Sequence, residues 1–333
     1  MPTVLLTHTP DMLANYYGAG PLAALRALCD VRLNETGKVL DNPAELAKAA
    51  QGCAIIVSDR QTPAPAEFFA QAPSELAAFL RVAIDIRNID VPAASKQGIL
   101  VTHATAGFIA SVAEQAIGYM IDWGRHTLDY TNEYRGGGDP VPRMGKQLSG
   151  ATLGILGYGA IGEHLARLGV AFGMKVKVSD PFKTITEPGV EQASFEDVLA
   201  QSDFVVCLVI ANEKTENLMN AQAFARMKKS AYFINVSRGN LVDEQALAKA
   251  LDDKIIAGAA MDVGRAQDQK PSLFLAKRPD IIATPHTAGL TPDAAEHQAY
   301  DTVNQVKEIL AGRIPPHAAN AASAHRLSMF TNR

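Results

Sequence analysis

The sequence predicts an α/β protein built on parallel sheets, and two observations along its 333 residues lead to this prediction. Short apolar runs typical of buried strands alternate with helical patterns, first within residues 1–101 and again from Thr152 onward. In the second part we expect six strands, near 152–156, 175–179, 204–209, 231–236, 256–260 and 280–284. Six parallel strands with right-handed crossovers form one doubly wound sheet, so the chain is expected to hold two α/β units.

Residues 1–101 predict the first unit. Its strands are expected at Val4–Thr7, Val31–Leu33, Ala54–Ser58, Leu80–Ala83 and Ile99–Thr102. Helices are expected at Ala23–Leu28 and Pro43–Ala50, with Asn42 as the N-cap of the second. This unit has no glycine-rich phosphate loop, so we interpret it as the part that holds the substrate and not as a second nucleotide site.

The connection between the units and the end of the chain have helical patterns of their own. The segment from Phe108 to about Tyr130 predicts one long helix, followed by a Gly- and Pro-rich loop at 135–145. Thr291 and Pro292 predict the start of a last helix that stops at Gly312. The final dozen residues have no readable pattern, and the alternatives are that they fray or pack on a partner subunit.

Composition and charge exclude several classes of function. The net charge of −4 and the pI of about 6.1 predict no basic surface for nucleic acid or anionic lipid. The longest apolar run, Phe204–Ala211, is too short to span a bilayer, and the first ten residues lack the pattern of a signal peptide. Three widely spaced cysteines have neither metal-ligand nor disulfide spacing. We therefore expect a cytoplasmic protein with no metal, no nucleic-acid partner and no membrane anchor.

The stretch TLGILGYGAIGEHLARLGVAFGMKVKVSD, from Thr152 to Asp180, has the pattern of a dinucleotide-binding turn. Its three glycines form G-x-G-x-x-G between a strand and a helix, which permits a tight turn, close approach to a pyrophosphate and close helix packing. Asp180 ends the next strand, where it can bind a ribose 2′-hydroxyl and repel a 2′-phosphate, which favours NAD over NADP. The predicted cofactor-binding residues are Gly157, Tyr158, Gly159, Ala160, Ile161, Gly162 and Asp180.

Two more polar residues are predicted at the carboxyl ends of strands, where ligands bind in parallel sheets. Arg238, in NVSRG, presents a planar fork that suits a carboxylate, although an arginine can also bridge surface carboxylates. His286, in TPH, can donate and accept a proton near neutral pH, although a structural histidine is the alternative. We interpret the other seven histidines as structural.

From about Leu80 to Asn320 the chain resembles the NAD-dependent D-2-hydroxyacid dehydrogenase family, which includes glyoxylate and hydroxypyruvate reductases and phosphoglycerate dehydrogenases. The resemblance rests on LGYGAIG with SDP, MKKSAYFINVSRGNLVDEQAL, AGAAMDV and IIATPHTAGLT, in the family's order. It implies two Rossmann- or flavodoxin-like doubly wound domains in a homodimer. The substrate-binding domain would combine residues 1–101 and 290–333 from both chain ends, around an NAD-binding domain at 102–289.

The resemblance also implies reversible hydride transfer between NAD and a small 2-keto acid or D-2-hydroxy acid. Arg238 matches the arginine that holds the substrate carboxylate and keto oxygen, and His286 matches the general acid that protonates the ketone. Asp262 matches the aspartate that contacts the nicotinamide carboxamide. Further cofactor contacts are implied at Thr215, Val236 and Ser237.

The chain departs from the family pattern beside the catalytic histidine. Five residues after its aspartate the family has a glutamate, whereas this chain has Gln267, followed by Asp268. We expect Asp268 to assist His286 with its negative charge. The alternative, Gln267 at this position, would leave the histidine without that charge, as in formate dehydrogenases of the superfamily.

Two further departures fall on the predicted substrate loops. Residues 82–88 read VAIDIRN where the family has AGVGVDN, so Ile84 and Asp85 are expected beside the substrate. We hypothesise that Asp85 accepts a hydrogen bond from a hydroxyl or amino group of that substrate. The segment HATAGFIAS places Phe108 and Ile109 where polar residues are usual, which also indicates an altered pocket.

Two other functions fit parts of this pattern. A non-catalytic, NAD-sensing corepressor could share the fold and retain both Arg238 and His286. A formate- or phosphite-type dehydrogenase would be favoured by Gln267 beside His286, but the formate type also requires an asparagine that the Phe108 segment lacks. We therefore expect an NAD-dependent enzyme.

Overall fold

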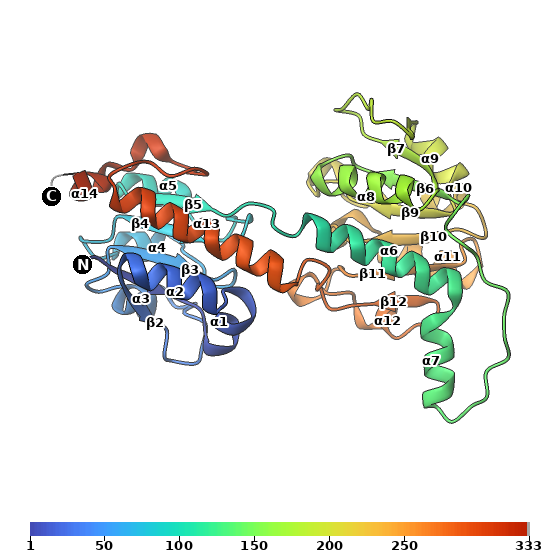
Figure 1. Ribbon diagram of the computed structural model, residues 1–333, viewed down its shortest axis with the longest axis horizontal. Coiled ribbons are helices and arrows are strands. Elements are labelled where there is room, and N and C mark those ends of the chain that lie inside the picture. Colours follow the sequence, from blue (N-terminus) through green and yellow to red (C-terminus); the bar gives the residue numbers. More distant parts are fainter. Residues whose placement is uncertain (332–333) are drawn as a thin grey trace. The chain divides into compact units, whose positions relative to one another are not determined.

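The computed structural model describes residues 1–331 and divides into two compact units. The first combines Met1–Phe108 with the segment from Leu290 onward, and the second is Ile109–Gly289. The sequence had placed the first boundary at 101/102 and the second at 289/290. Both ends of the chain lie in the first unit (Figure 1).

The first unit is built on a five-stranded parallel sheet with the order β2-β1-β3-β4-β5. The strands are β1 Thr3–Leu6, β2 Asp30–Leu33, β3 Ile55–Ser58, β4 Ala78–Arg81 and β5 Leu100–His103. They lie within two residues of the predicted strands, which confirms the periodicity argument for this unit. The strand order reverses between β1 and β3, and this is the position at which open parallel sheets form ligand crevices.

Helices cover both faces of this sheet: α1 Pro10–Tyr16, α2 Ala19–Leu28, α3 Pro43–Ala49, α4 Ala66–Ala70, α5 Val91–Lys96, α13 Pro292–Leu310 and α14 Ser328–Thr331. The predicted caps are present. The Asn42 side chain accepts the N–H groups of Ala44 and Glu45, and Thr291 accepts that of Ala294. These bonds satisfy donors that have no partner within the helix.

The C-terminal residues up to 331 pack on their own unit. Leu327 and Phe330 are buried in the cluster that also contains Val303 and Val306 of α13. Arg326 donates from Nη1 to the carbonyl of Leu76 at 3.0 Å. The expectation that these residues fray is therefore wrong for the described part, while 332–333 lie outside it. The sequence did not indicate this because the segment is short and its contacts are distant along the chain.

The second unit contains a seven-stranded parallel sheet with the order β12-β11-β10-β9-β6-β7-β8. The strands are β6 Thr152–Leu156, β7 Lys175–Ser179, β8 Val190–Gln192, β9 Phe204–Cys207, β10 Tyr232–Asn235, β11 Gly258–Met261 and β12 Ile281–Ala283. The doubly wound sheet is confirmed, and the predicted count of six strands was one too low. The missed strand β8 is a largely exposed edge strand, so it carries no apolar run.

The helices of this unit are α6 Ile109–Arg125, α7 Thr127–Arg135, α8 Ala160–Ala171, α9 Phe195–Gln201, α10 Ala221–Arg226, α11 Glu244–Asp252 and α12 Leu273–Ala276. Three 3-10 turns lie between them, η1 Glu213–Thr215, η2 Gly239–Leu241 and η3 Gln267–Gln269. The prediction of one long helix from Phe108 to Tyr130 was wrong. His126 has left-handed backbone angles, φ 56° and ψ 30°, which end α6 and begin α7. The Gly124 carbonyl accepts a hydrogen bond from Lys146 at 2.7 Å, a loop contact that local sequence does not reveal.

A buried polar cluster fixes the carboxyl ends of β1, β3 and β4 in the first unit. The Asp59 carboxylate accepts hydrogen bonds from the hydroxyls of Thr7 and Thr62, both at 2.6 Å. Arg81 donates to the carbonyl oxygens of Asp59 and Thr62. Burial acts to raise the pKa of Asp59, but the hydrogen bonds from Thr62 and Thr7 overcome it and the pKa is lowered. Burial also lowers the pKa of Arg81, to about 10.

His8 completes this cluster. Its burial should make the free energy of unfolding depend on pH. It is 2% exposed, neither ring nitrogen has a hydrogen-bond partner among residues 1–331, and burial lowers its pKa to about 4. The unfolded chain, with a pKa near 6.5, binds more protons between these values. The free energy of unfolding should therefore fall by up to about 3 kcal/mol as the pH drops from about 6.5 to about 4.

Urea unfolding of the native protein and of His8→Gln, at pH 7.5 and at pH 5, measures this effect. The variant should lose much of the difference between the two pH values, because its side chain does not titrate. His164→Gln, at a half-exposed position of α8, serves as the control and should keep the native pH dependence. Equal pH dependence in His8→Gln and the native protein would contradict the prediction.

Candidate functional site

The second unit brings the predicted site residues to one edge of its sheet. Following the strand order from β12 towards β7, the residues just after the strand ends are His286, Asp262, Arg238, Gly157 and Asp180. The sheet reverses its order between β9 and β6, so Gly157 stands at the switch point. Parallel strands end at the same edge, which explains how residues far apart in sequence meet here.

The glycine-rich turn has the geometry that a dinucleotide requires. Gly157 has φ +95°, and a Cβ there would lie 2.8 Å from the carbonyl carbon of Leu208 in the loop after β9. A Cβ on Gly162 would lie 2.4 Å from the Gly157 oxygen, whereas a Cβ on Gly159 would meet nothing within 4 Å. The backbone at Gly159 therefore faces open space at the start of the 12-residue helix α8, where N–H groups and the helix dipole favour a phosphate.

Asp180 is held at the tip of β7 by main-chain donors. Its carboxylate accepts the N–H groups of Tyr158 and Phe182, each at 2.8 Å. Tyr158 is 5% exposed, and the Nζ atom of Lys183 lies 5.8 Å from the centre of its ring. Asp180 is therefore tied to the glycine-rich turn through Tyr158, at a position that suits a ribose hydroxyl. The protein groups fit the NAD that the sequence predicts.

The segment after β10 is ordered by its own side chains. Asn235 donates from Nδ2 to the carbonyl of Arg238 at 2.9 Å, and the Ser237 hydroxyl donates to the carbonyl of Val209 at 2.7 Å. Arg238 is half-buried and donates from Nη1 to the carbonyl of Ser237 at 2.7 Å. Val236, also predicted to contact the cofactor, is 6% exposed. These bonds link the ends of β9 and β10.

Thr215 lies in the loop after β9, as the sequence indicates. Its hydroxyl donates to the carbonyl of Ile210 at 2.8 Å and accepts the N–H group of Asn212 at 2.9 Å. Together with the Asn212 side chain it forms a capping box for the 3-10 turn η1. Thr215 therefore gives this loop its shape.

Asp262 is the buried anchor of the segment that carries His286. Its carboxylate is 1% exposed and accepts hydrogen bonds from the Thr284 hydroxyl at 2.6 Å and from the N–H groups of Thr287 and Ala288 at 2.8 and 3.0 Å. Its carbonyl accepts the N–H group of His286 at 2.8 Å. His286 has φ 61°, an uncommon value for this residue type, and these bonds hold it there.

The His286 ring is contacted by main chain. Its Nδ1 atom lies 3.0 Å from the carbonyl oxygen of Asp268. The sequence predicts the Asp268 carboxylate, or else Gln267, at this ring. Asp268 has φ 57° and ψ 24°, a left-handed conformation that places its carbonyl at the histidine, and the side chains of Asp268 and Gln267 are exposed. An acceptor at Nδ1 favours the tautomer that carries its proton on that nitrogen.

One residue that orients this site was not predicted from the sequence. Tyr119, on α6, forms a hydrogen bond with the Thr284 hydroxyl, which in turn binds Asp262. Burial raises the pKa of Tyr119 well above its ordinary value, so the phenol stays neutral. Tyr119 lies on the buried stripe of a helix and therefore has the pattern of an ordinary core residue.

In the first unit the predicted substrate loop follows β4. Asn88 accepts a hydrogen bond from the buried Arg81, which anchors the loop. Asp85 forms an ion pair with Arg87, whose Nε atom lies 2.9 Å from each carboxylate oxygen. Ile84 is 40% exposed. Ile84 and Asp85 therefore face solvent at the carboxyl edge of this sheet, where a ligand of the unit can reach them.

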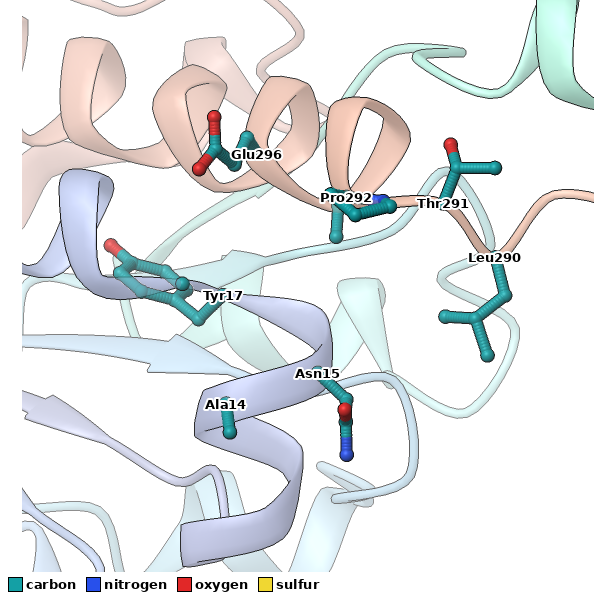
Figure 2. Close-up of a pocket in the computed structure, with 9 residues that line it drawn as sticks. Ala14, Asn15, Tyr17, Leu290, Thr291, Pro292 and Glu296 are labelled. Carbon is teal, nitrogen blue, oxygen red and sulfur yellow. The ribbon is translucent and has the colours of Figure 1, made fainter.

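The first unit also has a pocket of about 240 Å³ between the α1–α2 segment and the start of α13. Figure 2 shows Asn15 and Tyr17 on one side and Leu290 and Pro292 on the other. Tyr17 stacks edge-on against His8, with ring centres 5.2 Å apart. None of the residues predicted from the sequence to bind substrate or cofactor lines this pocket.

Comparison with known proteins places this geometry in a family. Residues 117–288 match the model of the D-isomer specific 2-hydroxyacid dehydrogenase NAD binding domain. The chain is 32% identical to the (S)-sulfolactate dehydrogenase of Chromohalobacter salexigens over 308 residues, 91% of this chain and 98% of that protein. It belongs to the D-isomer specific 2-hydroxyacid dehydrogenase family. The protein is thus an NAD-dependent dehydrogenase of 2-hydroxy acids, which confirms the fold class, the enzyme class and the cofactor predicted from sequence.

Other proteins of the family match different shares of this chain. It is 34% identical to the D-3-phosphoglycerate dehydrogenase of Synechocystis over 253 residues, which cover 75% of this chain but 45% of that protein. The structure of D-2-hydroxyisocaproate dehydrogenase superposes with a TM-score of 0.83 over 96% of this chain and 100% of that one, at 24% identity. This likeness shows the common two-sheet fold.

The described residues 1–331 offer neither a metal-binding cluster nor a helix suited to crossing a membrane. No group of three or more His, Cys, Asp or Glu side chains in that part of the chain is arranged to hold a metal ion. No helix within the same residues is long and apolar enough to cross a membrane.

The position of Asp180 predicts the cofactor preference of this dehydrogenase. In Asp180→Ser the charged acceptor for the ribose hydroxyl is lost, so NADH should bind about 10- to 100-fold more weakly. NADPH should bind better than it does to the native protein, because the repulsion of its 2′-phosphate is removed. Fluorescence titration with both nucleotides measures this. Asp197→Ser, at the exposed start of α9, is the control, and unchanged NADH affinity in Asp180→Ser would refute the assignment.

Proposed function

We propose that Arg238 and His286 carry the reaction of this dehydrogenase on a small 2-keto acid. The observation that carries the proposal is the placement of both residues just after strands of one sheet, Arg238 after β10 and His286 after β12, with Asp262 directly after the intervening strand β11. The forked guanidinium of Arg238 would bind the substrate carboxylate and polarise the keto oxygen. His286 would exchange the proton of that oxygen.

The protein groups around the cofactor have separate tasks. NAD, when bound, supplies or accepts the hydride. Gly159 and the first turn of α8 would hold its phosphates, and Asp180 its ribose. The loops at Thr215 and at Val236–Ser237 would border the same cofactor, and Asp262 would meet the nicotinamide carboxamide. The first unit, with its loop at Ile84 and Asp85, would supply the substrate-binding domain.

The proton transfer is governed by the surroundings of His286. During reduction the protonated ring gives its proton from Nε2 to the keto oxygen, while Nδ1 keeps its proton in the bond to the Asp268 carbonyl. During oxidation the neutral ring accepts the proton back. Asp268 would thus assist through its main chain, and the carboxylate expected from the sequence would face solvent.

Activity measurements test these roles. NADH oxidation, followed at 340 nm, would be assayed with glyoxylate, hydroxypyruvate, pyruvate, phenylpyruvate, 2-ketogluconate and 3-sulfopyruvate. His286→Ala should lower kcat by about 10²–10⁴-fold, because the general acid is lost. Arg238→Ala should lower kcat/KM by about 10²–10³-fold, because the carboxylate and the developing oxyanion lose their donor.

Separate outcomes would contradict the roles and the function. Full turnover in either variant would remove that residue from the mechanism. If the native protein binds NADH tightly and reduces none of the acids, the result would favour the alternative function, an NAD-sensing, corepressor-like protein. Asp85→Gly examines the substrate loop, because an unchanged ranking of the acids would show that Asp85 does not select among them.

We also propose that the protein resides in the cytoplasm. Its cysteines, Cys29, Cys53 and Cys207, are all unpaired and buried, as suits a reducing compartment. Burial raises the pKa of Cys29 to about 11 and that of Cys207 to about 12, so both thiols stay protonated and unreactive.

A homodimer through the second unit is our further proposal for its assembly. Helix α7 and residues 136–147 extend from the body of that unit (Figure 1). They expose apolar side chains, with Met144 at 96%, Val141 at 76% and Tyr134 at 63%. Arg143 lies over the ring of Tyr130 at 4.7 Å and holds the loop against α7. A projection that exposes several large apolar side chains in this way favours association with a second copy.

Charged substitutions in the projection test the dimer. The double variant Val141→Asp, Met144→Asp should elute as a monomer in size-exclusion chromatography with light scattering, because burying two carboxylates in the interface is unfavourable. Phe182→Asp alters a side chain that is 94% exposed elsewhere in the unit and should remain dimeric. A native monomer, or a double variant that stays dimeric, would contradict the proposal.

A further inference from the structure

Arg265 ties the loop that contacts His286 to the rest of the second unit. This loop, residues 264–270, follows β11 and carries the Asp268 carbonyl. The Arg265 side chain donates to the carbonyls of Val242 and Asn240 at 3.1 and 3.0 Å and to the Asn217 side chain at 2.6 Å, and its Nη2 atom lies 2.8 Å from the Glu216 carboxylate. The main-chain N–H group of Arg265 donates to the Glu244 carboxylate at 3.0 Å. The Arg265 side chain thus links its own loop to two other segments, 216–217 and 240–242.

The contacts of Arg265 connect the segment after Arg238 with the loop beside His286. Asn240 and Val242 belong to the 3-10 turn η2 and its cap, which begin directly after Arg238. The two loops also touch through main chain, since a Cβ on Gly239 would lie 2.1 Å from the carbonyl carbon and oxygen of Gly264. Arg265 therefore holds the segment after Arg238 and the loop of Asp268 against each other.

The loop needs such an anchor because its backbone is strained. Asp268 and Gln269 both have φ 57°, a left-handed conformation that is unfavourable for residues other than glycine. The Gln269 side-chain oxygen is buried without a hydrogen-bond partner among residues 1–331. The ion pair with Glu216 contributes little, because its carboxylate is 40% exposed. The bonds to main-chain carbonyls are the part that fixes the loop.

We propose that Arg265 is a positioning residue, which holds the Asp268 carbonyl against Nδ1 of His286 and keeps the segment after Arg238 in register. The carbonyl keeps the proton of the neutral ring on Nδ1, so that Nε2 remains available for proton exchange with the substrate. This inference rests on the proposed roles of Arg238 and His286. It assigns to Arg265 no contact with substrate or cofactor.

The test compares Arg265→Ala and Arg265→Lys with a matched control. Arg278→Ala removes an arginine of the same unit that pairs with Asp252 and Asp280, each at 2.8 Å, at the amino end of β12. Arg265→Ala should lower kcat by about 10- to 100-fold, because a shift of about 1 Å in a catalytic group has this effect. The affinity of this variant for NADH should be unchanged. Arg265→Lys should recover only part of kcat, since an ammonium group cannot reproduce the planar fork. Arg278→Ala should keep kcat.

A second readout does not depend on turnover. In ¹⁵N-histidine NMR spectra, with His286 assigned from His286→Ala, the neutral ring should show its proton on Nδ1 in the native protein. In Arg265→Ala the ring nitrogens should shift towards a mixture of the two tautomers, and in Arg278→Ala they should not. The NMR measurement separates the role of Arg265 from the proposed function, because it reports the tautomer of the His286 ring even if no keto acid is reduced.

Two results would overturn the inference. The first is a native His286 tautomer in Arg265→Ala. The second is a loss of kcat in Arg265→Ala that Arg278→Ala reproduces with the same loss of thermal stability. A native protein that reduces no keto acid would instead refute the proposed function, while the NMR result still decides the role of Arg265.

Discussion

Every group that this protein brings together for chemistry depends on one constraint: parallel strands end at the same edge of a sheet. In the second unit this edge carries His286, Asp262, Arg238, Gly157 and Asp180 in the order of their strands. Their sequence separations are large, and no local contact could collect them. The central strands β6, β9 and β11 hold this order, because they are buried along their whole length.

Main-chain groups orient most of the site. Asp262 receives two N–H groups and a hydroxyl, Asp180 receives two N–H groups, and the His286 ring meets a carbonyl. Main-chain partners move little, because the strands on either side hold them. This arrangement requires left-handed backbone at His286 and Asp268, so the surrounding bonds must offset the strain.

The corresponding edge of the first unit is organised differently. Its strand ends are filled by a buried cluster in which Arg81 and Asp59 share hydrogen bonds with threonines. The second unit instead leaves open space at Gly159. A filled edge cannot admit a dinucleotide backbone, and so the two similar sheets divide their tasks: one holds the cofactor, and the other presents an exposed loop at Asp85 and Arg87.

The sequence by itself determined every strand except β8, the Asn42 and Thr291 caps and the glycine turn, because each is specified by residues adjacent in the chain. The family motifs added the cofactor and the class of reaction. Only the tertiary structure decided the break at His126, the packing of Phe330, and the replacement of a carboxylate by the Asp268 carbonyl beside His286. Arg265 belongs with these, since its partners lie 21 to 49 residues away. Such contacts follow from backbone conformation and long-range packing, which no local pattern encodes.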